Sequence, residues 1–268
     1  MTGTMCRICT GLPDLGRRRL LRGAGAVAVT APLLGGCDAD DWIINLVPES
    51  QVQAMSFQTW QQIRATTPPS QDARRQGIVR EISDRLLRAN GHDPSRWQVQ
   101  LFASSQVNAF ALPGGKIGVF EGMFRVAENR GQLAAVIGHE IGHVTARHGQ
   151  SRMNADAMRN LGLRVINVAL GLSNVPYANE IAAVLGAGTE FGLLLPYSRN
   201  QELQADELGL FAMTKAGFDP AQAPALWRRM DAMVPQRGPT FLATHPAPVT
   251  RIQALEALIP KARAAAGV

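Results

Sequence analysis

Two segments in the first third of the chain carry apolar residues at the 3.6-residue period of an amphipathic helix. They cover residues 49–66 and 71–90, with polar side chains at most of the remaining positions. Three short strand-like runs follow, at 97–102, 108–112 and 116–120. A Pro-Gly-Gly turn at 113–115 separates the last two runs, so we predict a small antiparallel sheet after the two helices.

Helical periodicity dominates the rest of the chain. We predict helices at about 121–128, 130–148, 150–171, 178–194, 199–216, 220–233 and 247–259. The stretch 161–195 is the most apolar after the N-terminal region, but polar residues and a proline interrupt it, and no piece reaches the roughly 20 residues of a membrane span. We interpret it as packed helices that cover a cleft. The pattern as a whole predicts an α+β fold that is mostly helical.

The first 36 residues have the pattern of an export signal. A basic run at 17–22 precedes an uncharged apolar stretch at 23–34, which is too short for a membrane span. Its paired arginines are typical of twin-arginine signals, and both the twin-arginine route and the general secretory route stay open.

The residues after this apolar stretch resemble a bacterial lipoprotein box. Leu-Gly-Gly at 34–36 precedes Cys37, so we expect cleavage before Cys37 and a lipid anchor on it that holds the protein at a membrane. A buried or free Cys37 is the alternative. Residues 37–48 would then form a lipidated tether, 49–262 a single domain and 263–268 a disordered, alanine-rich tail.

Charge and composition mainly exclude partners. The chain of 268 residues has a formal net charge of +6, which at first suggests an anionic partner. Five basic residues and one acidic residue precede Cys37, however, so 22 basic and 20 acidic residues remain in the mature chain. Aromatic residues make up only 6% and do not alternate with basic ones, so we expect no nucleic-acid partner.

The candidate chemistry centres on the sequence HEIGH at 139–143. His139 and His143 are four residues apart in a helical pattern, so their imidazoles share one face and can bind one metal. Glu140, about a quarter-turn from His139, can reach a metal-held water without being a ligand. Catalytic zinc sites keep a water beside three protein ligands, and a carboxylate takes its proton. A polar helix face without metal is the alternative.

A second helical segment, 199–216, offers the third ligand. Glu202, Asp206 and Gly209 follow one another at i, i+4 and i+7 and therefore share a face. They would supply a carboxylate ligand, an outer carboxylate that accepts the second N–H of a ligand histidine, and a small residue for close helix packing. A solvated acidic face is the alternative reading of the two carboxylates.

Four blocks, in this order, resemble the HtpX/CaaX-protease superfamily of gluzincin metallopeptidases: NAFALPGGKIGVFEGM, IGHEIGHVTARHG, YSRNQELQADELG and THPAPVTRI. The similarity runs over about residues 49–260, and the chain is most similar to the small periplasmic lipoprotein members without membrane spans. The resemblance implies a zincin-like (minigluzincin) domain and one zinc ion (Zn2+) per chain.

The resemblance also implies roles for individual residues. Zinc would be held by His139, His143 and Glu202, with Glu140 as general base and acid and Asp206 as the outer partner of a ligand. His245 would stabilise the oxyanion of the tetrahedral intermediate, with Tyr197 and Arg199 as weaker candidates for that role. The edge strand would pair with an extended substrate through Asn108, Ala109, Phe110 and Ala111. His148, about 140° around the helix from His143, is interpreted as structural.

The implied function is zinc-dependent endoproteolysis of unfolded or misassembled proteins of the bacterial cell envelope. The protein would be a periplasm-facing lipoprotein, with the inner and outer membranes both open. A chaperone-like assembly factor with low or latent protease activity is the main alternative. A zinc-carrying lipoprotein is less favoured, because a carrier has no need of a glutamate beside the first histidine.

Overall fold

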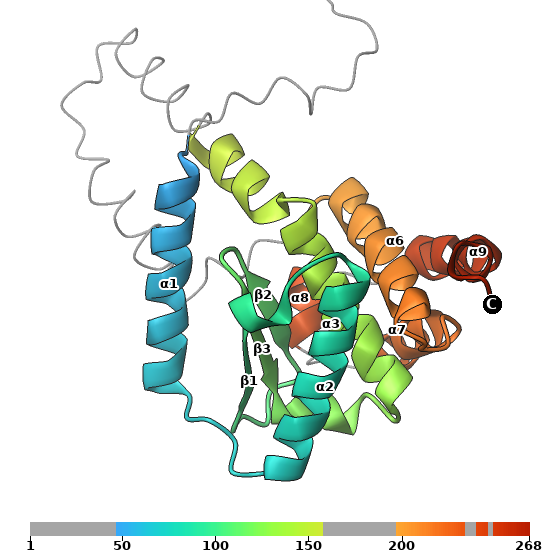
Figure 1. Cartoon of the computed structure of the whole chain (residues 1–268), viewed down its shortest axis with the longest axis horizontal. Coiled ribbons are helices and arrows are strands. Elements are labelled where there is room, and N and C mark those ends of the chain that lie inside the picture. Colours follow the sequence, from blue (N-terminus) through green and yellow to red (C-terminus); the bar gives the residue numbers. More distant parts are fainter. Residues whose placement is uncertain (1–46, 158–196, 234–239, 246–248) are drawn as a thin grey trace, which may run out of the picture. The chain divides into compact units, whose positions relative to one another are not determined.

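The computed structural model describes residues 47–157, 197–233, 240–245 and 249–268 (Figure 1). These residues belong to one compact unit, Trp42–Val268. Several predictions lie outside the described residues. They are the export signal, the lipidated Cys37, most of the tether, the apolar stretch 161–195, most of the helix expected at 150–171 and all of the helix expected at 178–194. Within the described ranges, no helix has the combination of length and hydrophobicity that crossing a membrane requires.

The two predicted N-terminal helices are present. They are α1 (Glu49–Thr66) and α2 (Ala73–Ala89), and α2 begins where the Asp72 carboxylate accepts the backbone N–H of Arg75. Each helix buries one stripe, which is what the periodicity predicts. The stripe of α2 consists mainly of Val79, Ile82, Leu86 and Leu87.

Three strands form the sheet: β1 (Gln98–Phe102), β2 (Ala109–Leu112) and β3 (Lys116–Phe120), in the order β1-β3-β2. The sheet is mixed and not wholly antiparallel as predicted, because β3 runs parallel to β1 and antiparallel to β2. The turn between β2 and β3 makes a hairpin, in which Gly114 and Gly115 have φ of 77° and 79°. Because β3 pairs with β2 in this hairpin and with β1 on its other side, β2 lies at an edge of the sheet, as expected.

The two faces of the sheet pack against different helices. Alternate strand residues join α2 and α3 in the main core, among them Leu101, Ala111 and Val119. The residues between them form a smaller aromatic cluster with Trp60 of α1, made of Phe102, Phe110, Leu112 and Phe120. Figure 1 shows α1 on one side of the sheet and α2 with α3 on the other. The α+β, mostly helical fold class is therefore confirmed.

Helices α3 (Arg130–Thr145) and α6 (Arg199–Lys215) are packed closely enough that glycine is required between them. A Cβ atom on Gly142 would lie 2.7 Å from the carbonyl oxygen of Ala205, and one on Gly209 would lie 2.7 Å from the backbone nitrogen of His139. The expectation that Gly209 allows a close helix approach is confirmed. This contact sets the distance between the two segments that carry the candidate ligands.

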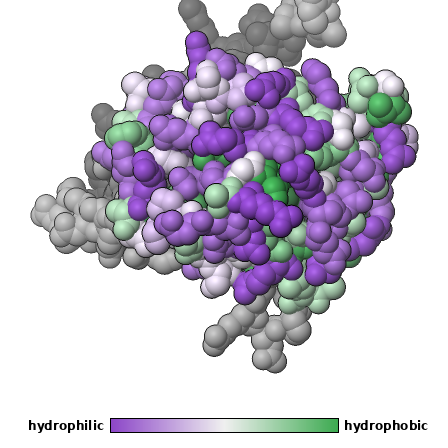
Figure 2. Space-filling model, turned by 60° about the horizontal axis from the view of Figure 1, so that its bottom comes forward, coloured by the Kyte–Doolittle hydropathy of each residue, from purple (hydrophilic) through white to green (hydrophobic). Residues whose placement is uncertain are grey.

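The remaining elements in the described residues are η2 (Pro94–Arg96), η3 (Glu121–Arg125), a helical segment at 148–157, α7 (Gln222–Ala232), α8 (Thr240–Thr244) and α9 (Val249–Ala266). The helix predicted at 121–128 is a short 3-10 turn, and α8 was not predicted. The tail expected to be disordered from 263 is helical through Ala266, because alanine favours helix and Ala262 is buried in the core. On the face shown in Figure 2, hydrophilic residues predominate and apolar residues form only small patches.

Candidate metal centre

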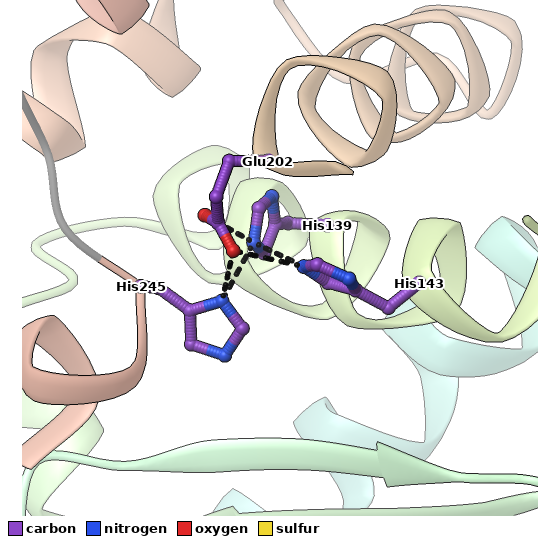
Figure 3. Close-up of side chains that lie close together, drawn as sticks. All are labelled: His139, His143, Glu202 and His245. Atoms are coloured by element: carbon purple, nitrogen blue, oxygen red, sulfur yellow. Dashed lines mark hydrogen bonds and ion pairs between the residues drawn. The ribbon is translucent and has the colours of Figure 1, made fainter. Parts of the chain in front are cut away.

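Four buried side chains from three parts of the fold converge on one point (Figure 3). His139 and His143 come from α3, Glu202 from α6 and His245 from the residue after α8. One nitrogen or oxygen from each lies within 4.8 Å of all the others. The structure thus brings together the three predicted ligands and adds a fourth donor.

The spacing of the three predicted ligands suits zinc. His139 Nε2 lies 3.0 Å from His143 Nε2 and 3.4 Å from Glu202 Oε2, and His143 Nε2 lies 3.4 Å from Glu202 Oε1. Zn–N bonds of about 2.0–2.1 Å place two ligand atoms of a tetrahedral site about 3.3 Å apart. Two imidazoles and a carboxylate are also a donor set that zinc accepts. The residues present therefore fit the ion.

Local structure explains how α6 presents Glu202. The helix starts with a capping box, in which the Ser198 hydroxyl accepts the Gln201 backbone N–H and the Gln201 side chain accepts the Ser198 N–H. Glu202 follows in the first turn, where a carboxylate is stabilised by the helix dipole. The close contact of α6 with α3 then holds this carboxylate over the two histidines.

Asp206 lies where the sequence places it. The Nδ1 of His139 is 2.9 Å from Asp206 Oδ1, so His139 donates its Nδ1 proton to Asp206 and turns its Nε2 towards the other donors. Burial would lower the pKa of His139, but the carboxylates of Glu202 and Asp206 outweigh it and raise the pKa to about 9. His139 Nε2 therefore also carries a proton at neutral pH, and a bound metal would displace it.

Arg251 is a functional neighbour that the sequence reasoning did not identify. Its Nε and Nη2 each donate to Asp206 at 2.7 Å, and its Nη1 lies 2.5 Å from Glu202 Oε2. The guanidinium is 1% exposed and stacks 4.3 Å from the ring of Trp227. Burial alone would raise the pKa of Asp206, but His139 and Arg251 lower it, so this carboxylate stays ionised.

His245 reaches both sides of the site. Its Nδ1 lies 3.2 Å from His139 Nε2 and 2.9 Å from Glu202 Oε1, which makes it the fourth donor. Its Nε2 lies 3.4 Å from Glu140 Oε1. The sequence anticipates His245 as an oxyanion donor near the metal; the structure brings it to the site, and that role stays a prediction.

Glu140 connects the candidate ligands to the edge strand. Its Oε2 accepts the backbone N–H of Ala111 at 3.3 Å, while its Oε1 has no hydrogen-bond partner among the described residues. Burial raises the pKa of this carboxyl group above its usual range, although His245 and His139 oppose the shift. A buried carboxyl group with a raised pKa is suited to accepting and returning a proton.

The predicted substrate strand borders the same cavity as the candidate catalytic residues. Ala109 and Ala111 direct their N–H groups away from β3, since the Asn108 carbonyl accepts Phe120 N–H on the β3 side. The Phe110 side chain packs against Trp60 on the other face of the sheet. The cavity is lined by Asn108, Ala109, Phe110, Ala111, Glu140, Tyr197, Thr244 and His245.

Tyr197 and Arg199, the weaker candidates for stabilising the oxyanion, lie in different surroundings. The Tyr197 ring stacks on His143 with centroids 3.9 Å apart, and burial raises the Tyr197 pKa to about 12, so its hydroxyl stays protonated. Arg199 is exposed at the start of α6. His148 also contacts His143. The sequence does not predict this contact, because its pattern indicates one continuous helix through both residues, and such a helix would place them on different faces.

Residues 69–259 match the model of Peptidase family M48. The chain belongs to peptidase family M48. This match covers more than two thirds of the chain and includes every candidate ligand. The match agrees with the resemblance to gluzincin metallopeptidases, which rests on the HEIGH block and the three other sequence blocks quoted above.

Named relatives of this M48 chain come from mitochondria and bacteria. Mitochondrial metalloendopeptidase OMA1 of Schizosaccharomyces pombe is 35% identical over 189 residues, or 69% of this chain and 53% of that protein. Beta-barrel assembly-enhancing protease of Escherichia coli K12 is 31% identical over 198 residues, or 71% and 40%. Mitochondrial metalloendopeptidase OMA1 of Saccharomyces cerevisiae is 31% identical over 201 residues, or 69% and 56%. The chain thus spans about half the length of these relatives.

Proposed function

We propose that this M48 chain is a zinc metalloendopeptidase, with His139, His143 and Glu202 as zinc ligands. The observation that carries the proposal is the donor set at zinc spacing, which stands beside a buried glutamate and an edge strand in one cavity. A zinc ion held there would polarise the scissile carbonyl and lower the pKa of a bound water to about 7.

Glu140 performs the proton transfers. Its carboxylate takes the proton from the attacking water and returns it to the leaving amine. In the described conformation its Oε2 accepts the N–H of Ala111. His245 stabilises the developing oxyanion through an imidazole N–H, a contribution of roughly 3 kcal/mol in comparable sites. Asp206 and Arg251 hold His139 and Glu202 in place.

An extended polypeptide is the substrate that the edge strand favours. Strand addition pairs backbone with backbone, so it gives affinity with little sequence selectivity. Ala109 N–H now bonds to Asn108 Oδ1 at 3.0 Å and Ala111 N–H to Glu140, so substrate carbonyls would replace these acceptors. An unfolded segment can adopt the required extended shape, whereas a folded domain presents few such segments.

The N-terminal sequence supports a place in the bacterial cell envelope. We propose that residues 1–36 direct export, that Cys37 carries a lipid anchor on a short tether, and that the domain at 49–262 faces the periplasm and cleaves unfolded or misassembled envelope proteins there. One relative is named for β-barrel assembly in a bacterium and two are named as mitochondrial.

Glu140→Gln tests the proposed mechanism directly. The purified protein should cleave a fluorescently labelled unfolded polypeptide, stop when a chelator is added and recover with zinc. Glu140→Gln should lower kcat at least 100-fold and still bind one zinc per chain, because it removes the base and no ligand. Glu207→Gln is the matched control, since Glu207 lies on α6 in an exposed ion pair with Lys261. Equal cleavage by Glu140→Gln and wild type would refute the mechanism.

A chaperone-like assembly factor with low or latent protease activity is the second candidate. The described conformation favours this candidate, because the atoms that proteolysis would use already contact other groups of the protein. Both outward N–H groups of β2 have acceptors, and His245 contacts the ligand atoms. Cells that carry only Glu140→Gln separate the two functions. Intact envelope function in those cells would favour the assembly role, and loss of it would favour proteolysis.

A further inference from the structure

His143 has an outer hydrogen-bond partner that differs in kind from that of His139. The Nδ1 atoms of His143 and His148 lie 2.9 Å apart, and His148 Nε2 lies 2.9 Å from Gln204 Oε1 on α6. His148 is 3% exposed. The three side chains form a hydrogen-bonded chain that runs from a candidate zinc ligand to the helix that carries Glu202.

Only one placement of protons satisfies every atom in this chain once His143 binds a metal. His143 Nε2 faces the other ligand atoms and must offer a lone pair, so its proton resides on Nδ1. His148 Nδ1 must then accept that proton, which leaves the His148 proton on Nε2. The amide oxygen of Gln204 is a pure acceptor and completes the chain.

A break in the backbone brings His148 to this position. Helix α3 ends at Thr145, and Arg147 has a φ of 55°, in the left-handed region that a non-glycine residue seldom adopts. Residues 148–157 then form a separate helix. The turn brings the His148 ring within 5.0 Å of the His143 ring, measured between centroids, at an interplanar angle of 71°.

We propose that His148 is a positioning residue that fixes the tautomer and the ring orientation of His143 for zinc binding. The proposal rests on the proposed function in one respect, that His143 is a zinc ligand. Tyr197 holds the face of the His143 ring by stacking, and His148 holds its edge. A neutral acceptor orients the ligand without adding charge to a buried site that already contains the carboxylates of Glu140, Glu202 and Asp206.

Two substitutions of nearly equal size separate positioning from packing. In His148→Asn, the amide Oδ1 is attached to Cγ as Nδ1 is in histidine, so it can accept the His143 proton. His148→Leu has the same branching and no acceptor. The zinc dissociation constant is measured on the full protein by competition with a chromogenic chelator, together with the thermal midpoint of each metal-free protein and kcat and KM for cleavage.

We expect His148→Leu to weaken zinc binding 10- to 100-fold and His148→Asn to stay within about threefold of wild type, with similar metal-free thermal midpoints. His92→Asn is the control, since His92 contacts Thr145 at the end of α3 and no candidate ligand. Equal zinc affinity in both variants and wild type would overturn the proposal. An equal loss in both that follows a loss of metal-free stability would overturn it too. Failure of the wild type to bind zinc would instead refute the proposed metal centre.

Discussion

Gly209 on α6 lies directly against the backbone nitrogen of His139 on α3, so that a Cβ atom on Gly209 would be 2.7 Å from it. Real Cβ atoms do not come that close to a neighbour, so any side chain here forces the helices apart. Each helix carries ligand atoms, and their separation therefore sets the donor spacing. We predict that Gly209→Ala weakens zinc binding at least tenfold and lowers the free energy of unfolding by about 1–3 kcal/mol. Chelator competition and urea unfolding measure the two effects.

Gly77 provides the matched control for this substitution. It lies inside α2, where an added Cβ would meet no atom within 4 Å. Gly77→Ala should stabilise the protein by about 0.5–1 kcal/mol, because alanine loses less conformational entropy in a helix, and should leave zinc affinity unchanged. Wild-type zinc affinity in Gly209→Ala would show that helix spacing does not control the donor geometry.

The sequence predicts the local part of the site well and the non-local part poorly. The convergence of His139 with His143, and of Glu202 with Asp206, follows from helical periodicity alone, because each pair is four residues apart. Helix–helix contact at Gly209 was also predictable, since a small residue on a ligand face permits close packing. These features need no knowledge of the tertiary fold.

His148 and Arg251 could not be predicted in this way. The position of His148 depends on the turn at Arg147, and an arginine gives no signal of a left-handed backbone. Arg251 contacts Asp206, which lies 45 residues earlier in the chain, so no local pattern connects the two residues. An arginine is also rarely buried without partners, so the sequence alone favours a surface position for it. The strand pairing was missed for the same reason, because the parallel contact of β1 with β3 joins segments that no short turn connects.

Arg251 should be more important for stability than any surface arginine. Its guanidinium contacts both Glu202 and Asp206 in a buried site, so its removal leaves two carboxylates without their cation. We predict that Arg251→Met lowers the free energy of unfolding of the metal-free protein by about 3–5 kcal/mol. Arg263→Met, which breaks an exposed ion pair with Asp219, should change it by less than about 1 kcal/mol. Equal effects in urea unfolding would contradict the burial argument.

Zinc binding should release a proton from His139. The neighbouring carboxylates raise the pKa of His139 to about 9, whereas burial keeps the pKa of His143 low, so the metal must displace one imidazole proton at pH 7. The apparent affinity should rise about tenfold per pH unit from pH 7 to 9 and then level off. Calorimetry in buffers of different ionisation enthalpy counts the protons. An affinity that is constant from pH 7 to 9 would contradict the raised pKa.

The same proton should make the stability of the metal-free protein depend on pH. The pKa of His139 is higher in the folded chain, at about 9, than the unfolded value of 6.5, so its stabilising contribution is complete below pH 6.5 and is lost as the pH rises through 9. We expect the urea midpoint in the presence of a chelator to fall between pH 6.5 and 9. The zinc-loaded protein should show a smaller fall, because its His139 carries no titrating Nε2 proton in this range.

Amide hydrogen exchange can detect strand addition at β2. In Glu140→Gln, an unfolded polypeptide should bind without being cleaved and should slow the exchange of Ala109 and Ala111, whose N–H groups point away from β3. The Leu101 amide on β1 is the internal reference, since Gln76 Oε1 already accepts it at 2.7 Å. A polypeptide with N-methylated backbone amides should give no protection, because it cannot form a ladder. Protection that appears equally with the methylated polypeptide, or not at all at Ala109 and Ala111, would place the substrate elsewhere.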